Sequence, residues 1–180
     1  MKLIEKIALE GMPNREYHNR QHTEEVRKEV IRLSNFTFVE EFKLQTAASF
    51  HDTGYIEGQE NHEKRSAHIA ERVMSAFGYN DRYIEDIKNI ILSTEFLSKP
   101  QSDLGAFLAD ADVASFGKPF QEFWNDRMAV KQEMFEDVPM DEWEKMSIEL
   151  LEKHEYHTKA AKDRYAKQKQ ENLRQLKERN

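Results

Sequence analysis

Apolar residues recur along this chain at the three- and four-residue intervals of an amphipathic helix, and no sustained two-residue alternation typical of a strand interrupts them. The clearest stripe consists of Ala70, Val73, Met74 and Phe77, and it stops at Gly78, a residue typical of a helix C-terminus. Comparable stripes lie within residues 22–33, 44–51, 84–91, 104–112, 148–151 and 161–176. The pattern therefore predicts an all-α fold of about eight helices.

Capping residues indicate where some of these helices begin. Asp81 is expected to cap the helix that contains Ile84, and Asp141 and Glu144 have the spacing of a capping box that opens a later helix. Breaks in the helical pattern fall at residues 34–39, 54–61, 96–103 and 135–141. Each break is short enough to be a loop, so none is expected to separate two domains.

The chain has 180 residues, a length typical of one domain, and we expect a single helical bundle over residues 1–180. Its core is expected within about residues 15–118, with the helices of residues 119–180 packed on that core. The last helix, which begins near Thr158, carries eight lysines and arginines. We interpret them as a solvated helix face rather than as a nucleic-acid-binding tail.

Composition narrows the functional classes. The formal net charge of −7 argues against general binding to nucleic acid or to an anionic membrane. No apolar run is long enough to span a bilayer, and Glu5 and Glu10 interrupt the N-terminal apolar stretch, so no signal peptide is expected. The chain contains no cysteine, which excludes disulfides and thiolate chemistry and is consistent with a cytoplasmic location.

Three polar residues, His22, His51 and Asp112, occupy the apolar faces of three different predicted helices. A lone inward histidine is commonly a hydrogen-bonded core residue, but an inward carboxylate needs a cation or several donors. The side chain of Asp52 can reach the same interior point as that of His51 only if their helix ends there, and Gly54 permits the helix to end. Two histidines and two aspartates that converge in the interior are suited to a divalent metal ion.

His18 precedes His22 by four residues, a spacing that on one helix places their Cβ atoms about 5–6 Å apart. This arrangement suits one metal ligand and one proton donor held beside a metal-bound substrate. The spacing alone equally allows His18 to be a surface residue near the start of a helix.

The order of His22, the pair His51-Asp52 and Asp112 resembles the H…HD…D signature of the HD superfamily of metal-dependent phosphohydrolases. The similarity is greatest to a bacterial branch of predicted HD phosphohydrolases, and it is carried by the strings REYHNRQH (15–22), FHDTGY (50–55), HEKRSAHIAERV (62–73) and LADADVASFG (108–117). The YHNxxH string is also similar to the start of the catalytic domain of cyclic-nucleotide phosphodiesterases. The resemblance implies a single-domain helical bundle of the HD-domain type.

The resemblance also implies roles for individual residues. His22, His51, Asp52 and Asp112 would bind a divalent metal ion, with Mg²⁺ or Mn²⁺ in use and Fe, Co, Ni or Zn as alternatives. Asp110 would then lie behind the ligands or at the surface. The expected catalytic residues are His18 as general acid, Asp52, and Glu63, for which an ordinary first-turn helix acid is the alternative. The expected substrate contacts are Arg15, Asn19, His62, Lys64 and Arg65.

The motifs and the resemblance together predict metal-dependent hydrolysis of a phosphate ester. The resemblance alone implies that the substrate, and so the partner, is a nucleotide or related small molecule. The alternatives are a cyclic-nucleotide phosphodiesterase and a non-catalytic binding protein in which the metal stabilises the fold. A di-iron oxygenase is disfavoured, because Thr94 and Glu95 stand where a further histidine ligand would be needed. The sequence defines no oligomeric state, and a homodimer is compatible with it.

Overall fold

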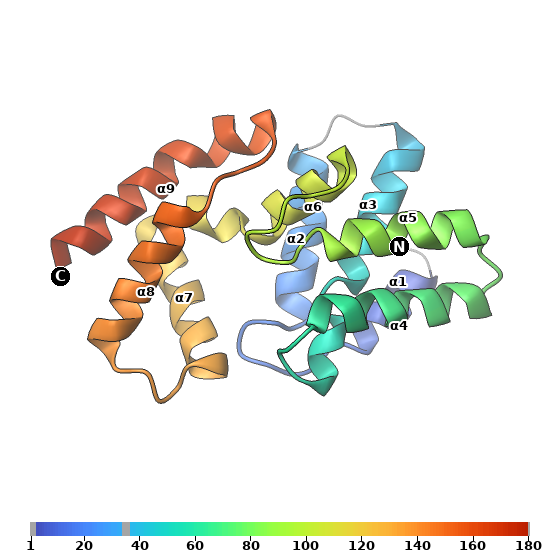
Figure 1. Ribbon diagram of the computed structural model, residues 1–180, viewed down its shortest axis with the longest axis horizontal. Helices are drawn as coiled ribbons and strands as arrows, with labels where there is room; N and C mark the ends of the chain where they lie inside the picture. Colours follow the sequence, from blue (N-terminus) through green and yellow to red (C-terminus); the bar gives the residue numbers. More distant parts are fainter. Residues whose placement is uncertain (1–2, 34–36, 180) are drawn as a thin grey trace.

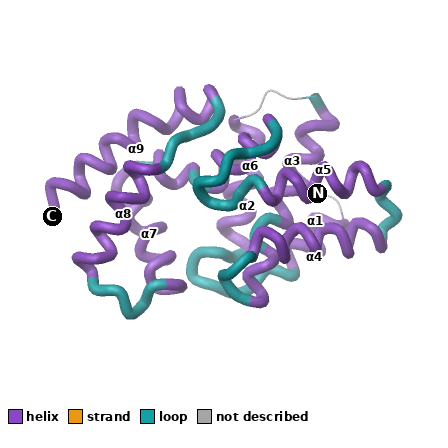
Figure 2. The backbone as a smooth tube through the Cα atoms, in the orientation of Figure 1, coloured by secondary structure: helices purple, strands orange, loops and turns teal. Residues whose placement is uncertain are grey.

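The computed structural model describes residues 3–33 and 37–179, and over these residues it contains helices and loops but no strand (Figures 1 and 2). The α-helices are α1 (Leu3–Glu10), α2 (Arg20–Leu33), α3 (Phe38–Phe50), α4 (His62–Ala76), α5 (Asp81–Leu92), α6 (Asp103–Asp112), α7 (Phe120–Met134), α8 (Met140–Lys153) and α9 (Lys159–Arg179). Two 3₁₀ turns, η1 (Thr53–Glu57) and η2 (Ala114–Gly117), follow α3 and α6. The all-α prediction is confirmed, with nine α-helices in the described residues where about eight were expected.

The turn between α4 and α5 shows how local sequence sets helix ends. Gly78 has φ +74°, the left-handed conformation that suits glycine just after a helix C-terminus. The N-cap of α5 is Asn80, whose side chain accepts a hydrogen bond from the Tyr83 backbone N–H. The prediction that Asp81 is this cap is wrong by one residue, since Asp81 already lies in the first turn of α5.

The capping box predicted to open α8 is also wrong. The helix begins at Met140 behind Pro139, which has extended backbone angles and provides no side-chain hydrogen bond. Asp141 and Glu144 therefore lie inside the helix, where neither can act as its N-cap. The fixed φ of proline starts this helix without a capping side chain.

One hydrophobic core joins the early and late parts of the chain. It includes Ile4 and Ala8 of α1, so the core begins before the expected boundary near residue 15. In Figure 1, α1–α6 gather on one side of the molecule and α7–α9 on the other. The two groups meet at η2, where the Asn172 side chain of α9 donates hydrogen bonds of 2.9 Å to the carbonyls of Phe116 and Lys118. The expected break at residues 34–39 lies partly outside the described residues.

Asp110 was expected behind the metal ligands or at the surface, but it is fully buried and connects α6 to the start of α9. Its carboxylate accepts hydrogen bonds from the backbone N–H groups of His157, at 2.8 Å, and Thr158, at 2.7 Å. These contacts satisfy backbone donors at the beginning of α9 and place negative charge at its positive end. Asp110 is thus a structural residue.

The final helix, α9, carries its basic residues mainly in ion pairs with neighbouring acids. Lys159 pairs with Asp163, and Lys177 lies 2.6 Å from Glu152 of α8. The apolar stripe is buried, as at Leu176. No described helix of the protein has the length and apolar character needed to cross a bilayer.

Candidate metal centre

Four side chains meet where α2, α3 and α6 come together. His22 lies in the first turn of α2, His51 and Asp52 directly follow α3, and Asp112 is the last residue of α6. The His22 Nε2 atom lies 3.0 Å from Asp112 Oδ1 and 3.4 Å from Asp52 Oδ2. The His51 Nε2 atom lies 3.2 Å from each of the same two oxygens. One possible ligand atom from each residue lies within 4.8 Å of all the others.

The end of α3 aims the pair His51-Asp52 at this point. His51 Nδ1 donates a 2.8 Å hydrogen bond to the Ala48 carbonyl, which leaves Nε2 facing the cluster. Asp52 has φ −107° and ψ 3°, so the backbone has left the α-helical conformation by this residue. The turn brings two consecutive side chains to one site, although on a continuing helix they would diverge by about 100°.

Gly54 was expected to permit the end of the helix that contains His51, but the structure gives it another role. The chain has already left α3 at Asp52, and Gly54 is instead pressed against the start of α4. An added Cβ would overlap the His62 carbonyl oxygen and lie 2.8 Å from the Ser66 backbone nitrogen. The Gly54 N–H also donates a 2.8 Å hydrogen bond to Ser66 Oγ. Glycine is required here because two backbone segments approach closely.

The cluster has the properties of a cation site. His51 and Asp52 are fully or almost fully buried, and among the described residues neither His51 Nε2 nor Asp52 Oδ2 has a hydrogen-bond partner. Buried polar atoms without partners are costly, and the carboxylates of the buried Asp52 and the partly buried Asp112 repel each other. A divalent cation bound by two imidazole nitrogens and two carboxylate oxygens relieves both costs. The residues present therefore fit a divalent metal ion.

The electrostatics of the four residues point the same way. Burial by itself raises the pKa of Asp52, but the neighbouring charge of His51 outweighs it, and the pKa falls to about 2. Burial likewise raises the pKa of Asp112, yet His51 and His22 hold it well below its usual range. For His51, burial lowers the pKa, and the charges of Asp52 and Asp112 raise it further than burial lowers it. The site thus favours positive charge between two ionised carboxylates.

His18 lies next to this cluster but precedes α2, so the spacing of two residues on one helix does not apply to His18 and His22. The helix begins at Arg20 because Asn19 caps it, with Asn19 Oδ1 accepting from the backbone N–H of His22 at 3.1 Å. The His18 ring is nevertheless 6.0 Å from the His22 ring, centroid to centroid. It stacks on Tyr55 of η1, with the centroids 3.9 Å apart and the planes 15° from parallel.

Glu133 of α7 is the residue near the site that the sequence analysis missed. Its carboxylate accepts a 2.7 Å hydrogen bond from His18 Nδ1 and two further bonds from the backbone N–H groups of Tyr17, at 2.8 Å, and His18, at 3.0 Å. Burial raises the pKa of Glu133, but hydrogen bonding and charge from His18 and these backbone bonds bring it down to about 2. Glu133 is therefore ionised and holds both the ring and the backbone of His18.

A signal for Glu133 does exist in the sequence. It follows Val130 by three residues on the apolar stripe of α7, the same kind of position that singled out Asp112. What the sequence does not give is the partner, since His18 is 115 residues away along the chain.

His62 and Glu63, at the start of α4, lie beside the cluster. His62 Nε2 is 3.4 Å from Glu63 Oε1 and 3.9 Å from Asp52 Oδ1. The His62 ring also contacts Tyr55, with centroids 4.0 Å apart. These two expected site residues therefore share one cavity with His18 and Asp52.

The other expected substrate contacts do not line that cavity. Arg15 donates a 2.8 Å hydrogen bond to the Tyr55 carbonyl, and Arg65 binds the carbonyls of Gly54, Gly58 and Glu60. Lys64 is exposed, and the Asn19 side chain is occupied in capping α2 and in bonding the Arg15 carbonyl at 2.9 Å. Arg15, Asn19 and Arg65 thus shape the loops around the site.

A family model described as the HD domain matches residues 18–117, which is more than half of the chain. The matched region begins at His18 and ends with η2, and it contains all four residues of the cluster. The chain belongs to the HD-domain family. HD domains are generally metal-dependent hydrolases, and this one contains a cluster able to hold a divalent ion. A search of curated proteins finds no match.

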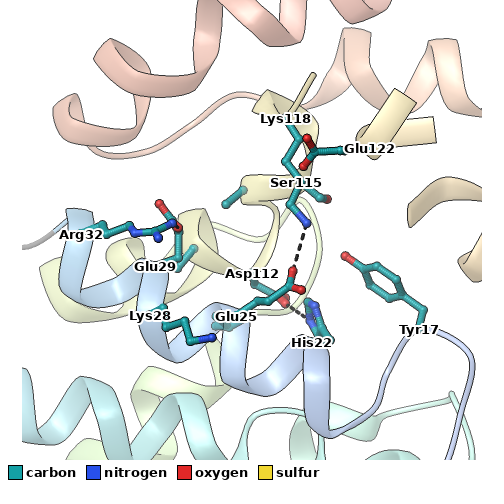
Figure 3. A pocket seen from close by; sticks show the side chains of 13 residues that line it. Tyr17, His22, Glu25, Lys28, Glu29, Arg32, Asp112, Ser115, Lys118 and Glu122 are labelled. Carbon is teal, nitrogen blue, oxygen red and sulfur yellow. Dashed lines mark hydrogen bonds and ion pairs between the residues drawn. The ribbon is translucent and has the colours of Figure 1, made fainter. Parts of the chain in front are cut away.

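Two cavities open onto the cluster of this HD domain, and both are lined by Tyr17, Asp112 and Ser115. The smaller has a volume of about 300 Å³ and lies beside α2 (Figure 3). In that view Lys118 reaches down to Glu25, at 3.0 Å, while the Tyr17 ring closes the opposite side near His22. The larger cavity, of about 640 Å³, extends from the cluster to α7 and α8.

Proposed function

We propose that this HD-domain protein hydrolyses a phosphate ester of a small molecule, with His22, His51, Asp52 and Asp112 holding a divalent ion. The observation that carries the proposal is the buried cluster itself, in which His51 Nε2 and Asp52 Oδ2 lack partners beside a cavity of about 640 Å³. When bound, such an ion supplies a water of lowered pKa and positive charge against the phosphate. Mg²⁺ or Mn²⁺ is the proposed ion in use, and Fe, Co, Ni or Zn are alternatives for a nitrogen–oxygen site.

His18 is proposed to donate a proton to the leaving oxygen. Its Nδ1 is taken by Glu133, and its Nε2 is the remaining ring nitrogen for the substrate. The ionised Glu133 holds the ring through its hydrogen bond to Nδ1, while Tyr55 supports one face of the ring by stacking. In this scheme Glu133 is a positioning residue and His18 is the general acid.

Asp52, His62 and Glu63 complete the proposed catalytic set. Glu63 Oε1 lies 3.4 Å from His62 Nε2, and the same nitrogen lies 3.9 Å from Asp52 Oδ1. We propose that His62 contacts the substrate and that Glu63 accepts a proton or orders water at this edge. A nucleotide as the substrate and a cytoplasmic location stay part of this proposal, supported by family resemblance and by the cysteine-free sequence.

The test is metal-dependent activity. Protein stripped with a chelator is resupplied with Mg²⁺, Mn²⁺, Co²⁺, Ni²⁺, Fe²⁺ or Zn²⁺ and assayed against nucleoside mono- and triphosphates, cyclic mono- and dinucleotides and bis-p-nitrophenyl phosphate. We expect product release that follows metal occupancy. Metal-loaded protein that hydrolyses no member of the panel would contradict the proposal and favour a binding protein stabilised by metal.

A further inference from the structure

Arg127 of α7 is the one arginine or lysine that lines the larger cavity among the described residues. Its guanidinium carbon lies 4.1 Å from the centre of the Trp143 ring, and its Nε donates a 3.2 Å hydrogen bond to Ser147 Oγ. No carboxylate in the described part of the chain forms an ion pair with it, although ion pairs are frequent elsewhere in this protein.

A cation in this position lacks a counter-charge. Burial lowers the pKa of Arg127 to about 10, and the Tyr17 phenol is the group that acts against this shift. The guanidinium therefore stays protonated at neutral pH, and a partly buried charge of this kind is stabilised by an anion. Arginine also presents several N–H donors in a plane, a geometry that matches phosphate oxygens.

Arg127 interacts with residues of both parts of the cavity lining. It interacts electrostatically with Tyr17, whose ring centroid lies 4.6 Å from that of His22 in the metal cluster. Its guanidinium lies over the ring of Trp143, and Trp143 contacts Phe135 with ring centroids 5.2 Å apart. We call the apolar residues that α7, α8 and the loop between them contribute to the lining the apolar end: Val130, Met134, Phe135, Trp143, Met146 and Leu150.

The apolar end offers little to a polar molecule. The amide side chains that line the cavity, Gln59 and Asn61, come from the loop before α4, on the HD-domain side. The residues that α8 contributes to the lining have one hydrogen-bonding side-chain group among them, the indole N–H of Trp143. This single donor cannot pair the several donors and acceptors on the edge of a nucleobase, whereas an apolar group would gain from burial.

We propose that Arg127 and this apolar end form a substrate subsite for a phosphate ester with a large apolar organic group. Arg127 pairs with an anionic oxygen of the substrate, and the organic group lies against Trp143 and its neighbours. This inference rests on the proposed hydrolysis of a small-molecule phosphate ester. Within that class it favours an ester with an apolar organic group over the nucleotide that the family resemblance suggests.

Binding can be tested without catalysis. Calorimetric titrations with and without Mn²⁺ would use naphthylmethyl phosphonate, methyl phosphonate, naphthylmethanol and AMP. We expect naphthylmethyl phosphonate to bind at least about tenfold more tightly than each of the other three. Methyl phosphonate lacks the apolar group, naphthylmethanol lacks the anion, and AMP carries a polar base in place of an apolar group. Arg127→Gln should lower its affinity at least about tenfold, while Arg174→Gln, which changes an exposed arginine of α9, should leave it unchanged.

A second variant keeps the test independent of any folding defect in Arg127→Gln. Met146→Trp fills the apolar end, and it should weaken naphthylmethyl phosphonate while methyl phosphonate binds as before. AMP or methyl phosphonate binding as tightly as the naphthyl compound, or an unchanged affinity in the folded Arg127→Gln variant, would overturn the subsite. If the expected binding is found but no ester is hydrolysed, the subsite stands and the proposed hydrolysis fails.

Discussion

The matched HD region and the two helices that follow it, α7 and α8, contribute different chemistry to the site. Residues 18–117 contain the histidines and aspartates of the cluster, whereas α7 and α8 contribute Arg127 and the apolar end of the cavity, and Glu133 of α7 holds His18. In Figure 1 the two groups of helices lie on opposite sides of the molecule. Under the proposed function, the matched region would therefore hold the metal ion, while α7 and α8 would position the general acid and select the substrate.

The two regions are nevertheless coupled at the loop before α2. Glu133 reaches back from α7 to the ring and backbone of His18, the first residue of the matched region. Substitutions away from this contact therefore test the two regions separately, whereas substitutions at the contact affect both.

The largest effect is expected from the metal cluster. Asp52→Ala should lower hydrolysis by on the order of 10³-fold or more, because the site loses a carboxylate that favours a bound cation. Metal content measured by mass spectrometry should fall with it, and helix content measured by circular dichroism should be retained. Asp163→Ala, which changes an exposed aspartate of α9, is the matched control and should alter neither quantity. Full activity in the Asp52 variant would remove the cluster from the mechanism.

The next effect tests the contact between the regions. His18→Gln should slow alkyl esters by roughly 10²-fold or more with metal content unchanged, and p-nitrophenyl esters much less, since their leaving group needs little protonation. Glu133→Gln should give a smaller loss, of roughly tenfold. In the double variant the two losses should not add, because Glu133 acts through His18. Glu136→Gln, an exposed neighbour on the same part of the chain, provides the control. Independent, additive losses would separate Glu133 from His18.

A smaller effect is expected on the pH dependence of stability. It arises at the contact between the two regions, where His154 is buried among Phe96, Phe116 and Tyr156. Burial lowers the pKa of His154 to about 3, with Lys169 and His157 adding to the shift. His154 therefore binds a proton near pH 6.5 in the unfolded chain but only near pH 3 in the folded protein. The free energy of unfolding falls as the pH falls through this range.

Between pH 6.5 and pH 5 this proton should lower the free energy of unfolding by about 2 kcal/mol. His154→Phe should remove that part of the pH dependence in urea unfolding curves, whereas His68→Phe, at an exposed site on α4, should retain it. Identical pH dependence in wild type and the His154 variant would show that the imidazole is not kept neutral by the fold.

Much of the helical framework was accessible from the sequence, because helical periodicity is a local property. The stripes of α2, α3 and α6 gave the inward positions of His22, His51 and Asp112, and the structure brings these three together with Asp52. Helix boundaries were less accessible. Asn19 caps α2, so His18 lies outside that helix. Pro139 precedes the first residue of α8, so Asp141 lies inside that helix instead of capping it.

The sequence by itself determined the all-α class and the buried faces of most helices, since each depends on residues a few positions apart. It also indicated the family, through short motifs that keep a fixed order along the chain. Only the tertiary structure decided which groups of separate helices contact one another. Glu133 binds His18, 115 residues away along the chain, and Arg127 of α7 lies over Trp143 of α8. No periodic pattern encodes such pairs, because they arise from how separate helices pack rather than from the order of residues within one helix.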